Sequence, residues 1–476
     1  YHLCTTATYP AIYHKRKILD IRLNIKDFSS VGVTGFEPAT TRPPDVYSNR
    51  TELRPDYPFP TAPDIRYLSV WDCKYSIFFR NIHISASFFS IFAGDETFLP
   101  LLAGLTALLA VACGSSGART PDDFTVELYT PRYAAGFDIR GTEHGTSSLV
   151  TVRNPWQGAT QVAQHLLVLR GEDEAPAGFD GTAVHAPVRR VVCMSSSHVA
   201  MFDALGEAGR IAGVSGIDYL SSADIQARRA AGTVRDVGYD TNLDFELLAA
   251  MQPDLVLLYG ISGENTIVTG KLRELGIPYI YVGDYVEESP LGKAEWLMLA
   301  AELCDRRDAG ADTLRQIATR YEALRAQVDT TAARPRVMLN TPYRDTWFMP
   351  SSRSYMIRLI EDAGGEYVYT KNDSSSSVAV DAEEAYLLAN DADVWLNVGA
   401  CNTLAELTAQ NPRFAAVPAV RNRRVWNNNR RQTPAGGSDF WESGVVRPDR
   451  VLADLIALLH DDGTADSCCC YYKRLE

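Results

Sequence analysis

Apolar runs and amphipathic stretches alternate along residues 189–304, and this alternation predicts the fold class. Runs of this kind that are apolar throughout, bounded by turn residues, are typical of buried strands. The predicted strands are residues 191–195, 211–215, 255–259 and 279–282. The helical patterns between them are residues 199–206, 245–251 and 266–275. Strands without a polar face that alternate with helices indicate a parallel sheet covered on both sides, so we predict an α/β lobe here.

A long helical period follows the first lobe. Apolar side chains recur at three- and four-residue spacing over residues 308–329, which predicts one helix roughly 33 Å long. A second series of strands and helices covers residues 335–460. The expected fold is therefore α/β, with two Rossmann-like parallel-sheet lobes bridged by one long helix within residues 305–334.

The segments beside the two lobes show weaker patterns. Within residues 114–188, a Gly-Ser tether precedes short alternating runs separated by Gly, Pro and Asn, which predicts a small antiparallel β appendage. Residues 461–476 carry three cysteines and two tyrosines without periodicity, so we expect a disordered tail.

Residues 1–95 show no sustained period, and part of them resembles peptides obtained by translating a structural RNA gene. We expect either a non-native extension or a disordered leader. Residues 96–113 then form an apolar run that is too short to span a bilayer but fits a signal peptide. The run ends in Ala110-Val111-Ala112-Cys113, which resembles a bacterial lipobox and implies a lipid on Cys113. A short buried helix with a core cysteine is the alternative.

Charge and composition exclude several classes of protein. The 476-residue chain has 46 Lys+Arg against 59 Asp+Glu, a formal net charge of −13. This acidity argues against a nucleic-acid binder, which needs a basic face. No apolar run reaches the ~20 residues of a spanning helix, which argues against a polytopic membrane protein. Nine cysteines are too few for a disulfide scaffold.

No catalytic or metal-binding constellation is specific in this sequence. Ser195-Ser-Ser-His198 follows a strand but lacks the glycines of a nucleophile elbow, and the five histidines after Cys113 are far apart. We expect no catalytic residue, no cofactor and no metal site, and we take Ser195–His198 as a polar loop at a strand end.

Aromatic residues near the predicted strand ends are the clearest candidates for ligand contact. Ligands of open parallel sheets bind outside the carboxyl ends of the strands, so two such lobes present two edges to one cleft. The candidates are Tyr219, Tyr239, Tyr259, Tyr343, Trp347 and Trp441. If the ligand is acidic, the candidate contacts are Arg344 and Arg430, together with Arg353 and Arg431. Packing of each aromatic under its own loop is the alternative.

Three segments resemble a known family. They are Asn242–Tyr259 with its Glu, helix and Pro-Asp-Leu-Val order, Leu275–Ile280, and Val380–Trp395. Together with the long helix, they resemble class III substrate-binding proteins of ATP-binding-cassette importers, which bind cobalamin, ferric siderophores or haem. The resemblance covers about residues 188–460.

The resemblance implies a solute-binding protein without catalysis, anchored to a bacterial membrane on the periplasmic side. It implies a metal-chelate ligand in the cleft and an importer permease as partner. It also implies one permease-docking carboxylate on each lobe, which segment matching assigns to Glu246 and Glu384, with Glu383 as competitor. An ordinary helix-terminal acid is the alternative for each. The alternative interpretations of the chain are a two-lobed enzyme (glycosyltransferase or chelatase-like) and a surface adhesion lipoprotein.

Overall fold

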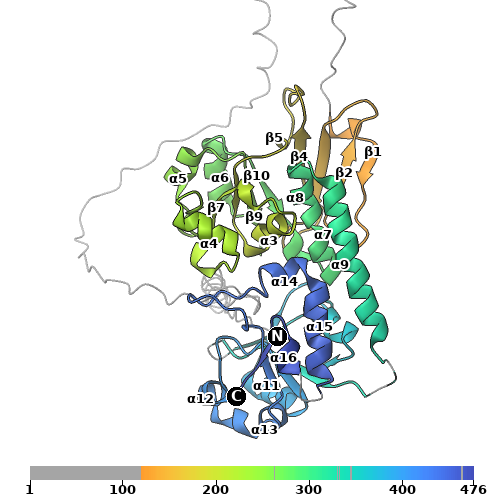
Figure 1. The fold of residues 1–476 in the computed structure, drawn as a ribbon, viewed down its shortest axis with the longest axis vertical. Coiled ribbons are helices and arrows are strands. Elements are labelled where there is room, and N and C mark those ends of the chain that lie inside the picture. The colour runs from red at the N-terminus through yellow and green to blue at the C-terminus, as the bar shows by residue number, and fades with distance from the viewer. Residues whose placement is uncertain (1–119, 262, 330, 332, 344–345, 462–464) are drawn as a thin grey trace, which may run out of the picture. The chain divides into compact units, whose positions relative to one another are not determined.

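The computed structural model describes residues 120–476, except for 262, 330, 332, 344–345 and 462–464. Cys113, the signal segment and the leader lie outside the described residues. Figure 1 shows the chain passing from a β sheet through a first α/β lobe and a long helix to a second α/β lobe. The predicted fold class is confirmed.

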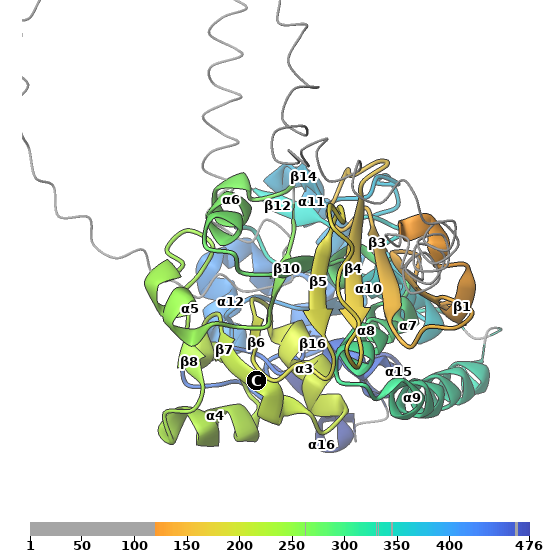
Figure 2. The same cartoon turned by 90° about the horizontal axis from the view of Figure 1, so that it is seen from above.

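The appendage is a five-stranded sheet in the order β1-β2-β3-β4-β5, seen side by side in Figure 2. Its first three pairings are antiparallel, but β4 and β5 pair in parallel, which the predicted antiparallel sheet did not include. The strands are β1 (Val126–Tyr129), β2 (Phe137–Gly141), β3 (Ser148–Arg153), β4 (Ala163–Leu169) and β5 (Thr182–His185).

Three buried carboxylates attach this sheet to the helices that follow the first lobe. Glu295 has no exposed surface and accepts hydrogen bonds from the Tyr129 hydroxyl at 2.6 Å and from three consecutive backbone amides, residues 132–134. Glu287 accepts from the next two amides, and Glu302 accepts from Ser148. Breaking any of these would leave a buried charge without its partners, so the appendage is a fixed part of the structure.

The first lobe contains a fully parallel sheet in the order β10-β9-β6-β7-β8. The strands are β6 (Val191–Cys193), β7 (Ile211–Val214), β8 (Arg235–Asp236), β9 (Leu255–Tyr259) and β10 (Tyr279–Val282). The helices are α3 (Ser196–Ala204), α4 (Ala223–Ala230), α5 (Phe245–Met251) and α6 (Thr266–Glu274). Side chains of β6 and β9 are buried on both sides of the sheet, which explains their continuous apolar sequence.

Three helices join the lobes, namely α7 (Pro290–Glu295), α8 (Leu297–Leu303) and α9 (Arg307–Gln327). Figure 1 shows α9 as the long helix beside α8 and α15 (Pro448–Leu459), and it packs against both. Its Tyr321 hydroxyl donates to Asp362 at 2.7 Å, and Arg320 pairs with Asp449 at 2.8 Å. Both acids belong to the second lobe, so α9 connects the two lobes.

The second lobe has a sheet in the order β13-β11-β15-β16-β17, parallel except for β17. The strands are β11 (Arg336–Leu339), β13 (Glu366–Tyr367), β15 (Val394–Leu396), β16 (Val425–Asn427) and β17 (Lys473–Arg474). A separate two-stranded antiparallel sheet pairs β12 (Trp347–Met349) with β14 (Val378–Val380). The remaining helices are α10 (Tyr355–Asp362), α11 (Ala382–Asn390), α12 (Leu404–Gln410), α13 (Pro418–Arg421), α14 (Ser443–Val446) and α16 (Ala465–Cys468).

The expected disordered tail is wrong for the part that the structure describes. Strand β17 adds an antiparallel edge to β16, and the side chains of Tyr471, Tyr472 and Leu475 have no exposed surface. Asp454 of α15 accepts hydrogen bonds from the backbone amides of residues 470–472. A strand of two residues leaves no periodicity to read, which is why the sequence pattern did not reveal it.

Candidate functional site

The carboxyl ends of the two parallel sheets are connected by a segment that leaves the second sheet and reaches the first lobe. We call residues 430–442 the crossing segment. The Thr433 hydroxyl donates to the Asp218 carbonyl at 3.0 Å, and the Trp441 carbonyl accepts from the Ser196 hydroxyl at 3.1 Å. Asp218 and Ser196 follow β7 and β6, so the crossing segment contacts the carboxyl edge of the first sheet.

Gly437 is where the crossing segment comes nearest to the first lobe. A Cβ atom placed on it would lie 1.9 Å from the carbonyl oxygen of Tyr219. Any other residue would push the two backbones apart, so glycine is needed here because of this approach.

Glu442 ends the crossing segment and holds it to the first lobe. Its carboxylate is 3 % exposed and accepts hydrogen bonds from the backbone amides of Ser221 and Ser222, just before α4. Burial raises the pKa of Glu442 to about 7, and the nearby Asp439 and Asp203 carboxylates add to the rise. The lobes are thus joined by a carboxyl group that titrates near neutral pH.

On the first-lobe side, His198 lies in α3 with no exposed surface. Neither of its ring nitrogens has a hydrogen-bond partner among the described residues, and Nε2 lies 3.8 Å from Asp284. Burial lowers the pKa of His198, although the Asp284 carboxylate opposes the shift. The Ser195 hydroxyl caps α3 by accepting from the Ser197 amide. The predicted polar loop over Ser195–His198 is wrong, because Ser196, Ser197 and His198 form the first turn of this helix and the last two are buried.

The structure brings two of the predicted first-lobe aromatics together. Tyr219 and Tyr239 interact, and burial together with this neighbour raises the pKa of Tyr239. Tyr239 is 38 % exposed and Tyr219 is half-buried. Tyr259 ends β9 but packs against a separate apolar cluster with Trp156.

The second-lobe aromatics separate into different environments. Tyr343 is 42 % exposed. Trp441 is half-buried, with its ring 4.7 Å from that of Phe440. Trp347, by contrast, is 1 % exposed, donates from Nε1 to the Leu339 carbonyl at 3.0 Å and stacks on Trp395. The prediction of Trp347 as a ligand contact is wrong in this structure, because its ring forms part of the second-lobe core.

The predicted cations are already engaged. Arg430 donates to the Tyr472 carbonyl and to Asp466, so it secures the tail. This placement contradicts its prediction as a ligand contact. Arg431 pairs with Asp439 at 2.8 Å and Arg353 with Glu288 at 2.5 Å. Arg344 lies outside the described residues.

A row of asparagines, which was not among the predicted site residues, lies at the carboxyl edge of the second sheet. Asn340, Asn397 and Asn427 end or follow β11, β15 and β16, and the backbone amides of Asn340 and Asn397 donate to the neighbouring strand, so the three lie side by side. Asn340 and Asn397 have positive φ angles of 64° and 57°. Asparagine tolerates this left-handed backbone, and the recurrence of Asn after three strands was the available signal.

The two docking candidates differ in their surroundings. Glu246 is exposed in the first turn of α5. Glu384, in the first turn of α11, pairs with Lys371 at 2.6 Å. The competing Glu383 is bound by both terminal nitrogens of Arg413, whose guanidinium lies over the Tyr386 ring. The hydrogen bond and charge of Arg413 lower the pKa of Glu383.

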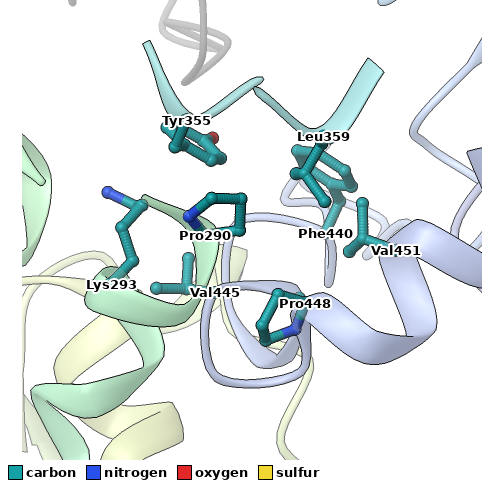
Figure 3. Close-up of a pocket in the computed structure, with 9 residues that line it drawn as sticks. Pro290, Lys293, Tyr355, Leu359, Phe440, Val445, Pro448 and Val451 are labelled. Carbon is teal, nitrogen blue, oxygen red and sulfur yellow. The ribbon is translucent and has the colours of Figure 1, made fainter. Parts of the chain in front are cut away.

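Figure 3 shows a small cavity between α7, α10 and the α14–α15 region. Its volume is about 10 Å³, about the space for one water molecule. The Lys293 ammonium lies 4.6 Å from the centroid of the Tyr355 ring and donates to the Asp284 carbonyl at 2.7 Å. This cavity is too small for a chelate ligand.

Within the described part of the chain, no three His, Cys, Asp or Glu side chains come together as metal ligands. In the same residues, no helix is long and apolar enough to cross a bilayer.

Comparison with known proteins gives three results. A family model described as periplasmic binding protein matches residues 191–427. An uncharacterized lipoprotein of Methanocaldococcus jannaschii is 26 % identical over 315 residues, which cover 63 % of this chain and 73 % of that protein. The similar solved structures include a periplasmic binding protein from Veillonella parvula, which is 15 % identical, with 66 % of this chain and 99 % of that chain covered and a TM-score of 0.48. They also include a periplasmic heme binding protein from Pseudomonas aeruginosa, which is 19 % identical, with 58 % of this chain and 94 % of that chain covered and a TM-score of 0.44.

Proposed function

The chain belongs to the periplasmic binding protein family through residues 191–427, and we propose that it is the solute-binding component of an ATP-binding-cassette importer. It captures a metal chelate of the siderophore, haem or cobalamin type between its lobes and delivers it to the permease. This family consists of solute-binding proteins, which favours binding over the alternative of a two-lobed enzyme.

One structural observation carries the proposal. The crossing segment links the carboxyl edges of the first- and second-lobe sheets through Ser196, Asp218 and Glu442. Ligands of parallel α/β sheets bind at this edge, so a small molecule held here would contact both lobes. The connecting helix favours modest movement of the lobes on binding.

Ligand contacts on this edge are expected from Tyr219, Tyr239, Tyr259, Tyr343 and Trp441. The exposed faces of Tyr239 and Tyr343 supply apolar area for a broad ligand. Truncating a good aromatic contact costs about 1–3 kcal/mol, or roughly 5- to 150-fold in affinity.

Isothermal titration of the purified protein tests the ligand class. The panel is cyanocobalamin, haemin and several ferric siderophores, and we expect micromolar or tighter binding to at least one. Tyr239→Ala is expected to weaken that binding. The control Tyr386→Ala removes the α11 ring that lies under the Arg413 guanidinium, and it should leave affinity unchanged. Failure of every panel member to bind at micromolar concentration contradicts the proposal.

A lipid anchor on Cys113 is the second part of the proposed function. It is supported by the small-residue sequence before Cys113 and by the lipoprotein name of the similar archaeal protein. An anchor would hold the protein at the outer face of the membrane, beside the permease it serves.

A further inference from the structure

The asparagine row continues into Asn428, directly after Asn427, and has unpaired polar atoms that the proposed function does not explain. Asn340 and Asn397 are 5 % and 4 % exposed, and Asn428 is 7 % exposed. Asn340 Oδ1, Asn397 Nδ2 and Asn428 Nδ2 are buried and lack a hydrogen-bond partner among the described residues. A buried polar atom without a partner destabilises the folded state, so three at one sheet edge point to an external partner.

In two of these side chains the other amide atom makes a hydrogen bond, and this bond determines whether the unpaired atom is a donor or an acceptor. Asn340 Nδ2 donates to the Phe348 carbonyl at 3.2 Å, leaving Oδ1 as an acceptor. Asn397 Oδ1 accepts from the Tyr472 hydroxyl at 3.0 Å, leaving Nδ2 as a donor. The row therefore presents a neutral set of one acceptor and two donors.

The three predicted arginines that the structure describes do not favour an acidic ligand. Arg430, Arg431 and Arg353 each face a carboxylate, namely Asp466, Asp439 and Glu288. An acidic ligand would have to displace one of these carboxylates, whereas a neutral hydrogen-bonding ligand leaves the pairs intact.

We propose that Asn340, Asn397 and Asn428 form an amide subsite that selects a neutral chelate by its carboxamide or hydroxamate groups. This inference rests on the proposed function. The carbonyl oxygens of such a ligand accept from the two asparagine donors, and its amide N–H groups donate to Asn340 Oδ1. The ligand's charge, rather than its flat shape, then decides selection among chelates.

The three unpaired amide atoms of the subsite are buried in this structure, so the proposal requires a movement for ligand entry. The crossing segment begins next to Asn429, and its Ser438 hydroxyl donates to the Asn428 carbonyl. Displacement of this segment from the first lobe opens the row and exposes the amides.

Four probes test the selection by isothermal titration with the full mature protein. Ferrichrome is a neutral ferric trihydroxamate, and cyanocobalamin carries neutral carboxamides. Haemin has two propionates, and ferric enterobactin is a trianion. We expect one of the neutral probes to bind at least about tenfold more tightly than both acidic ones. Tighter binding of haemin or ferric enterobactin overturns the amide subsite but leaves the proposed function intact. No binding of any probe overturns both.

Two substitutions then test the residues. Asn397→Asp and Asn428→Asp keep the shape of each side chain but replace the unpaired donor with an acceptor, so each should weaken the neutral probe about tenfold. The control Asn422→Asp changes an exposed asparagine after α13 and should bind as the parent does. Circular dichroism melting confirms that each variant is folded. Affinities of both Asp variants within twofold of the parent would show that internal water satisfies the amides, and would overturn the subsite.

Discussion

Individual carboxylates in this protein have opposite pH responses because their surroundings differ. Burial and the neighbouring Asp439 and Asp203 raise the pKa of Glu442 to about 7. Asp449, although also buried, has its pKa lowered by Arg447 and Arg320. The first type of group favours the folded state when protonated, and the second favours it when ionised.

Glu442→Gln should reduce the loss of stability that occurs as pH rises. The folded protein binds the Glu442 proton more tightly than the unfolded chain, so the contribution of Glu442 to stability is fully present below pH ~4.5 and is lost as the pH rises through about 7. This contribution corresponds to about 3 kcal/mol of unfolding free energy. Urea unfolding at pH 5 and 7.5 measures it. The control Glu246→Gln changes an exposed carboxylate and should retain the parent's pH dependence. An unchanged slope for Glu442→Gln would contradict the assignment.

Cys113→Ser should release the protein from the membrane, because serine has no thiol to carry the lipid. Fractionation of cells that express the full chain, followed by immunoblotting, measures the change. Substitution of Cys193, which is buried in β6, by serine is the matched control and should leave membrane association intact. Retention of the Cys113→Ser protein in the membrane fraction would exclude the lipobox.

At the scale of elements, the short tail strand β17 contributes more to stability than its length suggests. The residues that flank β17, namely Tyr471, Tyr472 and Leu475, are fully buried. The Tyr472 hydroxyl also donates a hydrogen bond to Asn397 Oδ1. The tail therefore supports both the second-lobe core and the proposed subsite.

Leu475→Ala should lower the unfolding free energy by about 2–5 kcal/mol, as expected for a fully buried leucine. Leu387→Ala is the matched control, because Leu387 is 61 % exposed on α11 and should change stability by less than about 0.5 kcal/mol. Denaturant unfolding compares the two variants. Equal small effects would show that the tail is not folded onto the lobe in solution.

For the whole molecule, delivery of ligand requires contacts outside the site. Glu246 on the first lobe and Glu384 on the second are the proposed docking carboxylates, and each lies in the first turn of a helix. An acidic group on each lobe matches a permease that presents arginines.

Charge reversal by Glu246→Lys or Glu384→Lys should leave ligand affinity within about twofold while uptake falls at least about tenfold. Reversal replaces attraction to a permease arginine by repulsion, and neither residue belongs to the asparagine row. Calorimetry measures affinity, and uptake of the bound chelate by cells with the permease measures delivery. Glu274→Lys, which changes an exposed carboxylate at the last residue of α6, is the control. Loss of ligand binding in the docking variants would place them in the site instead.

The sequence by itself determined the two lobes and the long helix. Strands buried on both faces need a continuous apolar run, and α9 needs a repeating apolar face, so both leave a local signal. The tertiary structure decided the rest. Trp347 and Tyr239 are both aromatic residues in loop-rich segments, but only packing shows that one is core and the other exposed. The asparagine row likewise joins Asn340 to Asn397, 57 positions apart, and Asn397 to Asn427, 30 positions apart, because parallel pairing, rather than sequence distance, brings strand ends together.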